Sequence, residues 1–201
     1  MARVVFYISM SEKLFIPVLL GTNREGRESE KAAQWLTGLM EKRGDITTRL
    51  IDVRDFVFPQ VGYGRDIKDQ FPEYRDTIQK ADGLLIVSPE YNHGYPGILK
   101  SVLDLLMKEY FHKAVGIAGV SSGMLGGARM IEHLLPLMRE FGLVPIFKHM
   151  IFPNIKTFFD EAGNPKEEKY LTMGEDFIEE LVWMAKTLKW GRNNLPTKFR
   201  Q

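Results

Sequence analysis

The sequence predicts an α/β fold with a mostly parallel sheet and helices on both of its faces. Apolar runs of strand length alternate along the chain with longer stretches in which apolar residues recur at helical spacing. The run 83–87 is apolar throughout, as expected for a central strand that is covered on both faces. A chain of 201 residues suits one compact domain, which we expect to span 1–201.

The elements of the first half follow from short apolar runs and from helix stops. Strands are expected at 14–20, 49–53 and 83–88. Apolar residues at helical spacing from Ala32 to Met40 predict a helix that Gly44 ends. A long connection at 55–70, rich in aromatic residues, Gly and Pro, then precedes a helix at about 73–80.

In the second half, helices are expected at 96–111 and 127–141, and strands at 114–120 and 144–152. Pro96 suits a first helical turn, and Pro136 predicts a bend in the later helix. A last amphipathic helix carries an apolar stripe of Phe177, Leu181, Met184 and Leu188. Five strands with intervening helices suit a flavodoxin-like, doubly wound fold of three layers and strand order 2-1-3-4-5. Its ligand crevice would lie at the carboxyl ends of the strands.

The two ends of the chain stand outside this pattern. Residues 1–13 are a possible N-terminal extension, in which Met1–Ser9 are either a segment upstream of a true start at Met10 or an added short edge strand. Residues 192–201 are expected to be a frayed or partner-bound tail. Trp183 and Trp190 lie off or at the edge of the apolar stripe, where a subunit interface would use them.

Composition excludes several classes of function. Lys plus Arg number 27 and Asp plus Glu number 26, so a formal charge of +1 gives no broad attraction to nucleic acid or anionic lipid. The chain has no cysteine, which rules out thiolate nucleophiles, iron–sulfur clusters and Cys-ligated zinc. No stretch approaches the ~20 apolar residues of a membrane span. We therefore expect a cytoplasmic protein without a nucleic-acid or membrane partner.

Residues 21–29 form a loop that combines hydroxyls, two Arg and two Gly just before a helix. Backbone N–H groups at a helix N-terminus favour an anion, and guanidinium groups bind phosphate oxygens in bidentate fashion. A phosphate site is one interpretation. The alternative is that Ser29 only caps the helix while Arg24 and Arg27 are solvated. The loop is neither a Walker A loop nor a Gly-x-Gly-x-x-Gly fingerprint.

Two further loops are expected at the same edge of the sheet. Residues 88–97 contain two Pro and two Gly, with Tyr91 and Tyr95 as flat surfaces and Asn92 and His93 as hydrogen-bonding groups. This loop suits a planar heterocycle, or else it is an ordered turn whose tyrosines pack on the sheet edge. The loop 121–127 adds small residues and free amides before another helix.

The segment Ser-Pro-Glu-Tyr-Asn-His-Gly-Tyr-Pro-Gly-Ile-Leu-Lys-Ser-Val-Leu-Asp at 88–104 is the most specific motif of the chain. It resembles the Pro-Glu-Tyr-Asn…Pro-Gly…Leu-Lys…Asp signature of the NADPH-dependent FMN reductase family of flavodoxin-like proteins, which includes quinone, azo-dye and chromate reductases. The resemblance extends over about 14–143, and the order of loops agrees throughout.

The resemblance implies an FMN site made of the three loops. Around the phosphate it places Thr22, Arg24 and Ser29, with Arg27 as a neighbour. Along the isoalloxazine and ribityl chain it places Pro89, Glu90, Tyr91, Asn92 and His93, and on the other side Ser121, Ser122 and Gly123. The family loop is often a shorter Gly-Ser-x-Arg-x-x-Ser, and here Arg27 stands where that Ser would fall. Lys100 and Asp104 also match the signature, although one helical turn apart they suit a simple ion pair.

The resemblance further implies an oxidoreductase in which FMN accepts a hydride from NADPH or NADH and passes electrons to a small acceptor. Quinones, free flavins, azo compounds and metal oxyanions are the acceptor classes. The chemistry is on the flavin, so no catalytic side chain is required. Homodimers or homotetramers are implied, with the partner subunit often completing the flavin cleft. The alternatives are a non-enzymatic electron carrier or redox sensor, and an interaction module that has lost its cofactor.

Other candidate sites have simpler explanations. His112, His133 and His149 are widely separated and lack the His-Glu-x-x-His spacing, so no metal centre is expected. Asp52 and Asp55 follow a strand end, where solvated acids and loop caps are usual. The chain has no Gly-x-Ser-x-Gly elbow, so we do not expect a serine hydrolase.

Overall fold

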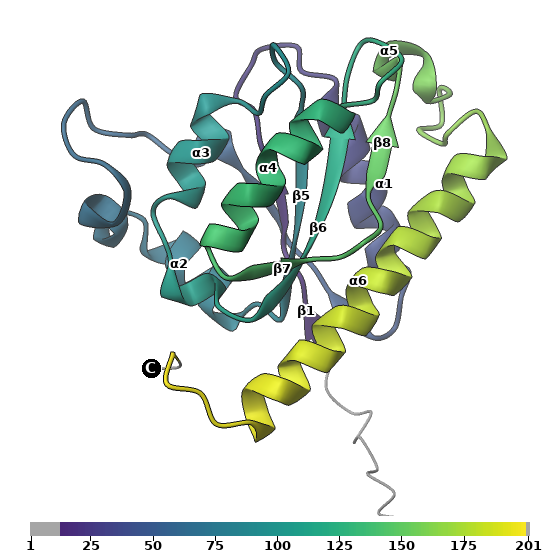
Figure 1. Cartoon of the computed structure of the whole chain (residues 1–201). Helices are drawn as coiled ribbons and strands as arrows, with labels where there is room; N and C mark the ends of the chain where they lie inside the picture. Colours follow the sequence, from purple (N-terminus) through teal and green to yellow (C-terminus); the bar gives the residue numbers. More distant parts are fainter. Residues whose placement is uncertain (1–12, 200–201) are drawn as a thin grey trace, which may run out of the picture.

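The computed structural model describes residues 13–199, which form a parallel sheet between two layers of helices (Figure 1). The α/β, flavodoxin-like fold expected from the sequence is confirmed. Both interpretations of Met1–Ser9 concern residues that lie outside the described part of the chain.

The main sheet has six strands, ordered β4-β2-β5-β6-β7, with β8 also paired to β6. The strands are β2 Val18–Leu20, β4 Leu50–Asp52, β5 Gly83–Pro89, β6 Lys113–Val120, β7 Leu143–Pro145 and β8 Met150–Phe152. All of these pairings are parallel. Spatially this is the expected order 2-1-3-4-5, because β7 and β8 together occupy the place of the fifth strand.

Two of the expected strands are interrupted. The first is divided into β1 Leu14–Phe15 and β2, and β1 pairs with an unexpected strand, β3 Ile46–Thr47, in a small second sheet. Pro17 stands at the break, and a proline has no N–H to donate to a ladder. The last expected strand divides into β7 and β8, with the 76% exposed side chain of Phe147 between them.

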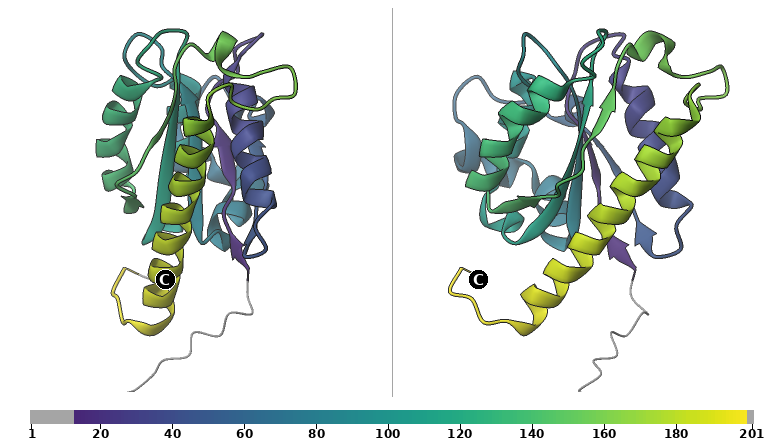
Figure 2. Two further views of the ribbon diagram at one scale, coloured as in Figure 1. Left: turned by 90° about the vertical axis from the view of Figure 1, so that its right-hand side faces the viewer. Right: turned by 45° about the vertical axis from the view of Figure 1, so that its right-hand side comes forward.

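Helices cover both faces of the sheet (Figure 2). On one face α1 Ser29–Glu41 and α6 Glu168–Asn194 pack over one apolar cluster. On the other face lie α2 Pro72–Lys80, α3 Gly97–Leu103 and α4 Ala128–Glu140, over a second cluster. A short α5, Ile155–Phe158, was not expected. Within α6, Phe177 and Leu181 are buried, while Trp183 and Trp190 are 57% and 42% exposed.

The predicted helix at 96–111 is too long, because α3 ends at Leu103. The backbone beyond it forms tighter turns, with Leu105 N donating to Val102 O at 3.3 Å. Leu103, Leu105 and Leu106 are all buried, and such consecutive burial does not fit the single apolar face of a continuing surface helix. A short 3-10 helix, Lys108–Tyr110, then turns the chain toward β6.

The predicted start of the C-terminal tail at residue 192 is also wrong, because this residue is still helical. α6 continues to Asn194, and Arg192 within it donates to Asp82 Oδ1 at 3.1 Å and to the His112 carbonyl at 2.7 Å. Asp82 is 7% exposed and also accepts from Phe15 N at 3.1 Å. The end of α6 is therefore fastened to the amino edge of the sheet, opposite the crevice.

Candidate functional site

The loops that follow β2, β5 and β6 meet at the carboxyl edge of the sheet. Leu20 at the end of β2 pairs with Val87, and Pro89 at the end of β5 pairs with Val120, so neighbouring strands end side by side. Close packing begins at once after β2, because a Cβ on Gly21 would lie 2.9 Å from Leu99 Cδ2. The fold thus brings together the three loops that the sequence singled out.

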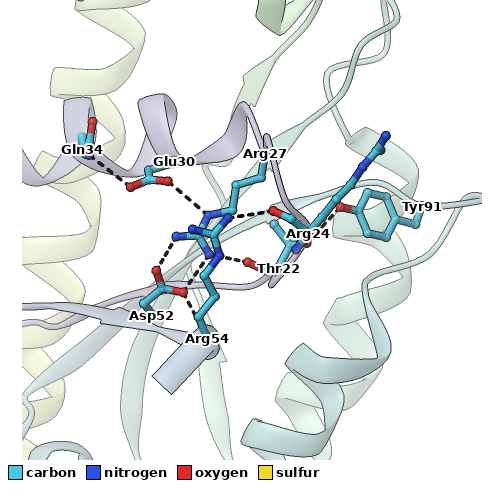
Figure 3. Close-up of polar contacts among 8 residues, drawn as sticks. All are labelled: Thr22, Arg24, Arg27, Glu30, Gln34, Asp52, Arg54 and Tyr91. Carbon is cyan, nitrogen blue, oxygen red and sulfur yellow. Dashed lines mark hydrogen bonds and ion pairs between the residues drawn. The ribbon is translucent and has the colours of Figure 1, made fainter. Parts of the chain in front are cut away.

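In the first loop, Arg27 is engaged by groups of the protein itself (Figure 3). Its side chain is 2% exposed, and Nη1 donates to Asp52 Oδ1 at 2.7 Å while Nη2 contacts the other carboxylate oxygen. Nη1 also donates to the Thr22 carbonyl, and Nε donates to Glu30 at 3.3 Å. The alternative that Arg27 is solvated is wrong, since this guanidinium braces the loop against β4.

Arg24 presents the opposite situation. Its side chain has no hydrogen bond or ion pair to any residue from 13 to 199, and Figure 3 shows it extending away from Asp52 on the side of Tyr91. Its backbone carbonyl accepts from Arg54 Nη2 at 2.8 Å, which was not expected from the sequence. Three guanidinium groups therefore lie close together at this edge of the sheet, and that of Arg24 has no partner among residues 13–199 and can bind an anion.

Ser29 is buried and its hydroxyl has no hydrogen-bond partner among the described residues. It is the first residue of α1, and the capping position belongs to Glu28. The alternative that Ser29 is only a helix cap is therefore wrong. A buried, unpaired hydroxyl costs free energy unless something binds it. Two acids flank it: Glu28 Oε2 lies 2.7 Å from Lys31 Nζ, and Glu30 accepts from Arg27 Nε at 3.3 Å.

The second loop is a tight turn fastened to the first loop. Tyr91 and Gly94 exchange backbone hydrogen bonds of 2.9 and 3.0 Å, and Asn92 and His93 between them have φ of 47° and 71°. Both are exposed at the tip of the turn. The Tyr91 hydroxyl lies 2.9 Å from Thr22 Oγ1, a hydrogen bond that joins the two loops.

The third loop is held against the second by Glu90. Its N–H donates to the Val120 carbonyl at 2.9 Å, and its carboxylate accepts from Arg129 Nε at 2.7 Å. Within the third loop Ser121 Oγ donates to the Gly123 carbonyl at 2.9 Å, while Ser122 and Gly123 are exposed. Arg129, in the first turn of α4, was missed because only the fold places it opposite Glu90.

Lys100 of α3 forms the expected ion pair with Asp104, the residue directly after this helix. The Tyr63 hydroxyl, from the long connection after β4, donates to the same carboxylate. Burial raises the pKa of Asp104 above its usual value. No sequence pattern relates Tyr63 to Asp104, since the two are separated by the whole of α2 and β5.

Two negative findings concern the described residues only. From 13 to 199 the chain holds no group of three or more His, Cys, Asp or Glu arranged to bind a metal ion. Over the same range no helix is both long and apolar enough to cross a membrane.

The comparisons with known proteins show the family of the chain. Residues 15–166 match the NADPH-dependent FMN reductase family, and the chain belongs to that family. A 2-hydroxy-1,4-benzoquinone reductase of Burkholderia sp. is 32% identical over 171 residues, 79% of this chain and 90% of the relative. A quinone reductase of Escherichia coli K12 is 32% identical over 139 residues, 64% of this chain and 71% of the relative.

Among solved structures, the NAD(P)H:acceptor oxidoreductase FerB of Paracoccus denitrificans has a TM-score of 0.71 at 23% identity, covering 86% of this chain and 98% of FerB. That likeness concerns the fold. Family membership together with the named relatives makes the chain an FMN-dependent oxidoreductase driven by NAD(P)H. The electron-carrier and sensor alternatives find no support among these relatives.

Proposed function

We propose that this enzyme reduces quinones with NADPH or NADH, using FMN bound at the carboxyl edge of the sheet. The observation that supports the site most strongly is the buried hydroxyl of Ser29, unpaired within residues 13–199, at the start of α1 and in the same loop as the free guanidinium of Arg24. The quinone is proposed because curated relatives are named quinone reductases. Free flavins, azo compounds and metal oxyanions are the other acceptor classes.

The phosphate of FMN would be held by Thr22, Arg24 and Ser29. Helix α1 is thirteen residues long and directs its first N–H groups at this place, which favours an anion. Arg27, which the resemblance places as a neighbour of the phosphate, has a bracing role in this proposal. Its bonds to Asp52 and to the Thr22 carbonyl fix the loop that carries the phosphate-binding groups.

The ring and the ribityl chain would lie between the second and third loops. We assign Pro89, Glu90, Tyr91, Asn92 and His93 to one side, and Ser121, Ser122 and Gly123 to the other. When bound, FMN supplies the electron transfer itself, taking two electrons from the nicotinamide and giving them to the acceptor. The residues of the chain bind and orient the reactants, and backbone N–H groups of the loops stabilise negative charge at the ring.

Because the flavin stores the electrons between the two half-reactions, the donor can leave before the acceptor binds. We therefore expect the donor and the acceptor to use one cleft in turn. Initial rates measured against both NADPH and a benzoquinone should then give parallel double-reciprocal lines. Intersecting lines would contradict the shared cleft, while an FMN-loaded protein that reduces no quinone would contradict the proposed acceptor. Repeating the series with NADH compares the two donors.

Three further expectations stay predictions. The two apolar clusters lie on opposite faces of one sheet, which supports residues 1–201 acting as a single domain. A homodimer or homotetramer is supported by the exposed Trp183 and Trp190 of α6, and sedimentation equilibrium would test it. The cytoplasmic location expected from the sequence is tested by cell fractionation.

A further inference from the structure

An ion pair joins the second loop of the proposed ring site to the helix that follows the third loop. Glu90 comes directly after β5, and Arg129 lies in the first turn of α4, which follows the third loop. Arg129 Nε donates to Glu90 Oε1 at 2.7 Å, and Nη2 lies 2.5 Å from the same oxygen. The pair therefore ties the second loop to the start of the helix that follows the third loop.

The backbone around this pair leaves little room for movement. Glu90 N donates to the Val120 carbonyl at 2.9 Å, so the second loop is fixed to the end of β6. A Cβ on Gly127 would lie 2.5 Å from Val120 N, which means that the residue before α4 is packed directly on β6. Helix α4 begins at this edge of the sheet (Figure 1). Glu90 and Arg129 are thus placed by closely packed backbone.

The two partners differ greatly in exposure. The Glu90 side chain is 5% exposed, whereas that of Arg129 is 44% exposed. Glu90 Oε2 is buried without a hydrogen-bond partner in residues 13–199. A carboxylate that is removed from water in this way depends on its single cation, because an unpaired buried charge is costly.

We propose that Arg129 is a positioning residue that neutralises the Glu90 carboxylate beside the flavin ring and thereby sets the potential at which bound FMN is reduced. This proposal rests on the proposed function, since it requires FMN between these loops. Reduction adds negative charge to the ring. A bare Glu90 carboxylate would oppose that charge, and a bare Arg129 guanidinium would favour it.

The proposal predicts opposite effects for the two single variants. Arg129→Gln should lower the midpoint potential of bound FMN, and Glu90→Gln should raise it. In each variant the ratio of the dissociation constants of oxidised and reduced FMN should change by about tenfold. For a two-electron couple this corresponds to a change of about 30 mV in midpoint potential. The double variant should return close to the wild-type potential. If the pair only held the loops in place, both single variants would shift the midpoint potential in the same direction.

The test is a titration of FMN into each apoprotein, followed by anaerobic equilibration with a reference dye. Arg139→Gln is the matched control, because it makes the same charge change in the last turn of the same helix, and its potential should equal that of the wild type. Arg129→Lys keeps the charge and should stay near the wild-type potential. If Arg129→Gln does not fold, Glu90→Gln and Arg129→Lys still give the comparison.

The outcomes separate this proposal from the function on which it rests. Wild-type protein that binds no FMN would overturn both. If the wild-type protein binds FMN, two results would overturn only the role of the pair. Either both single variants have the potential of Arg139→Gln, or both shift in the same direction. Opposite shifts that cancel in the double variant would support it.

Discussion

Arg27 in the first loop and Asp52 at the end of the edge strand β4 form a two-point ion pair, with Nη1 2.7 Å from Oδ1. Asp52 also accepts from Arg54 N at 2.9 Å, which caps the turn after β4. Burial opposes ionisation of Asp52, yet hydrogen bonding to Arg27 holds the pKa of its carboxyl below the ordinary value. The proposed phosphate loop is thus attached to the sheet before any ligand binds.

Replacing Arg27 by Met tests this bracing role. The Asp52 carboxylate would lose its main partner, and we expect the apoprotein to lose about 2 kcal/mol of unfolding free energy, a buried-pair effect reduced by the partial exposure of Asp52. Urea denaturation of apoprotein measures it. Unchanged stability together with lost FMN affinity would instead make Arg27 a direct phosphate ligand.

Arg24→Ala should weaken FMN binding by about tenfold or more, because a charge-assisted hydrogen bond to the phosphate is lost. The stability of the apoprotein should not change, since this guanidinium has no partner among residues 13–199. Fluorescence titration with FMN and with riboflavin checks the assignment, because riboflavin lacks the phosphate. Equal weakening for both flavins, or none for FMN, would show that Arg24 does not bind the phosphate.

Ser29→Ala should separate stability from binding. Removing a buried, unpaired hydroxyl should leave the apoprotein as stable as before or stabilise it by up to about 1 kcal/mol. FMN should bind about tenfold more weakly, while riboflavin should be unaffected. Thermal unfolding of the apoprotein and the same two titrations give both quantities. A destabilised apoprotein with unaltered FMN affinity would assign Ser29 a purely structural role.

Lys113 should make stability depend on pH. Burial, assisted by the charge of Arg192, lowers the pKa of Lys113 to about 8, while its Nζ donates to the Gln79 carbonyl at 3.0 Å. Between pH 8 and about 10.4 the unfolded chain holds a proton at this residue that the folded chain has released, so stability rises with pH. Relative to Lys113→Met, wild-type protein should gain about 2 kcal/mol from pH 7 to 10 in urea denaturation. A difference that stays constant with pH would contradict the lowered pKa.

Local patterns in the sequence were enough to predict the alternation of strands and helices and the three loops at the carboxyl edge of the sheet. A continuous apolar run such as β5 and a glycine such as Gly21 carry that information in neighbouring residues. The end of α3 was not predictable in the same way. Its apolar residues continue beyond Leu103, and only burial on several sides reveals that the helix has ended.

The hydrogen-bond and ion-pair partners of the loop residues could not be predicted from the sequence either. Thr22 and Ser29 were recognised by residue type, but nothing local shows that Arg27 belongs to Asp52, twenty-five positions away. The pairing of Glu90 with Arg129 likewise depends on β5 and β6 ending side by side. Residue chemistry predicted which loops form the site, and tertiary packing decides which side chains remain free to bind a ligand.

The most direct test of the whole account is the visible absorption spectrum of the purified protein with added FMN, followed by anaerobic addition of NADPH or NADH. We expect a protein-bound flavin spectrum that is bleached by at least one of the two nucleotides. A bound flavin that neither nucleotide bleaches, or a protein that binds no FMN, would contradict the account.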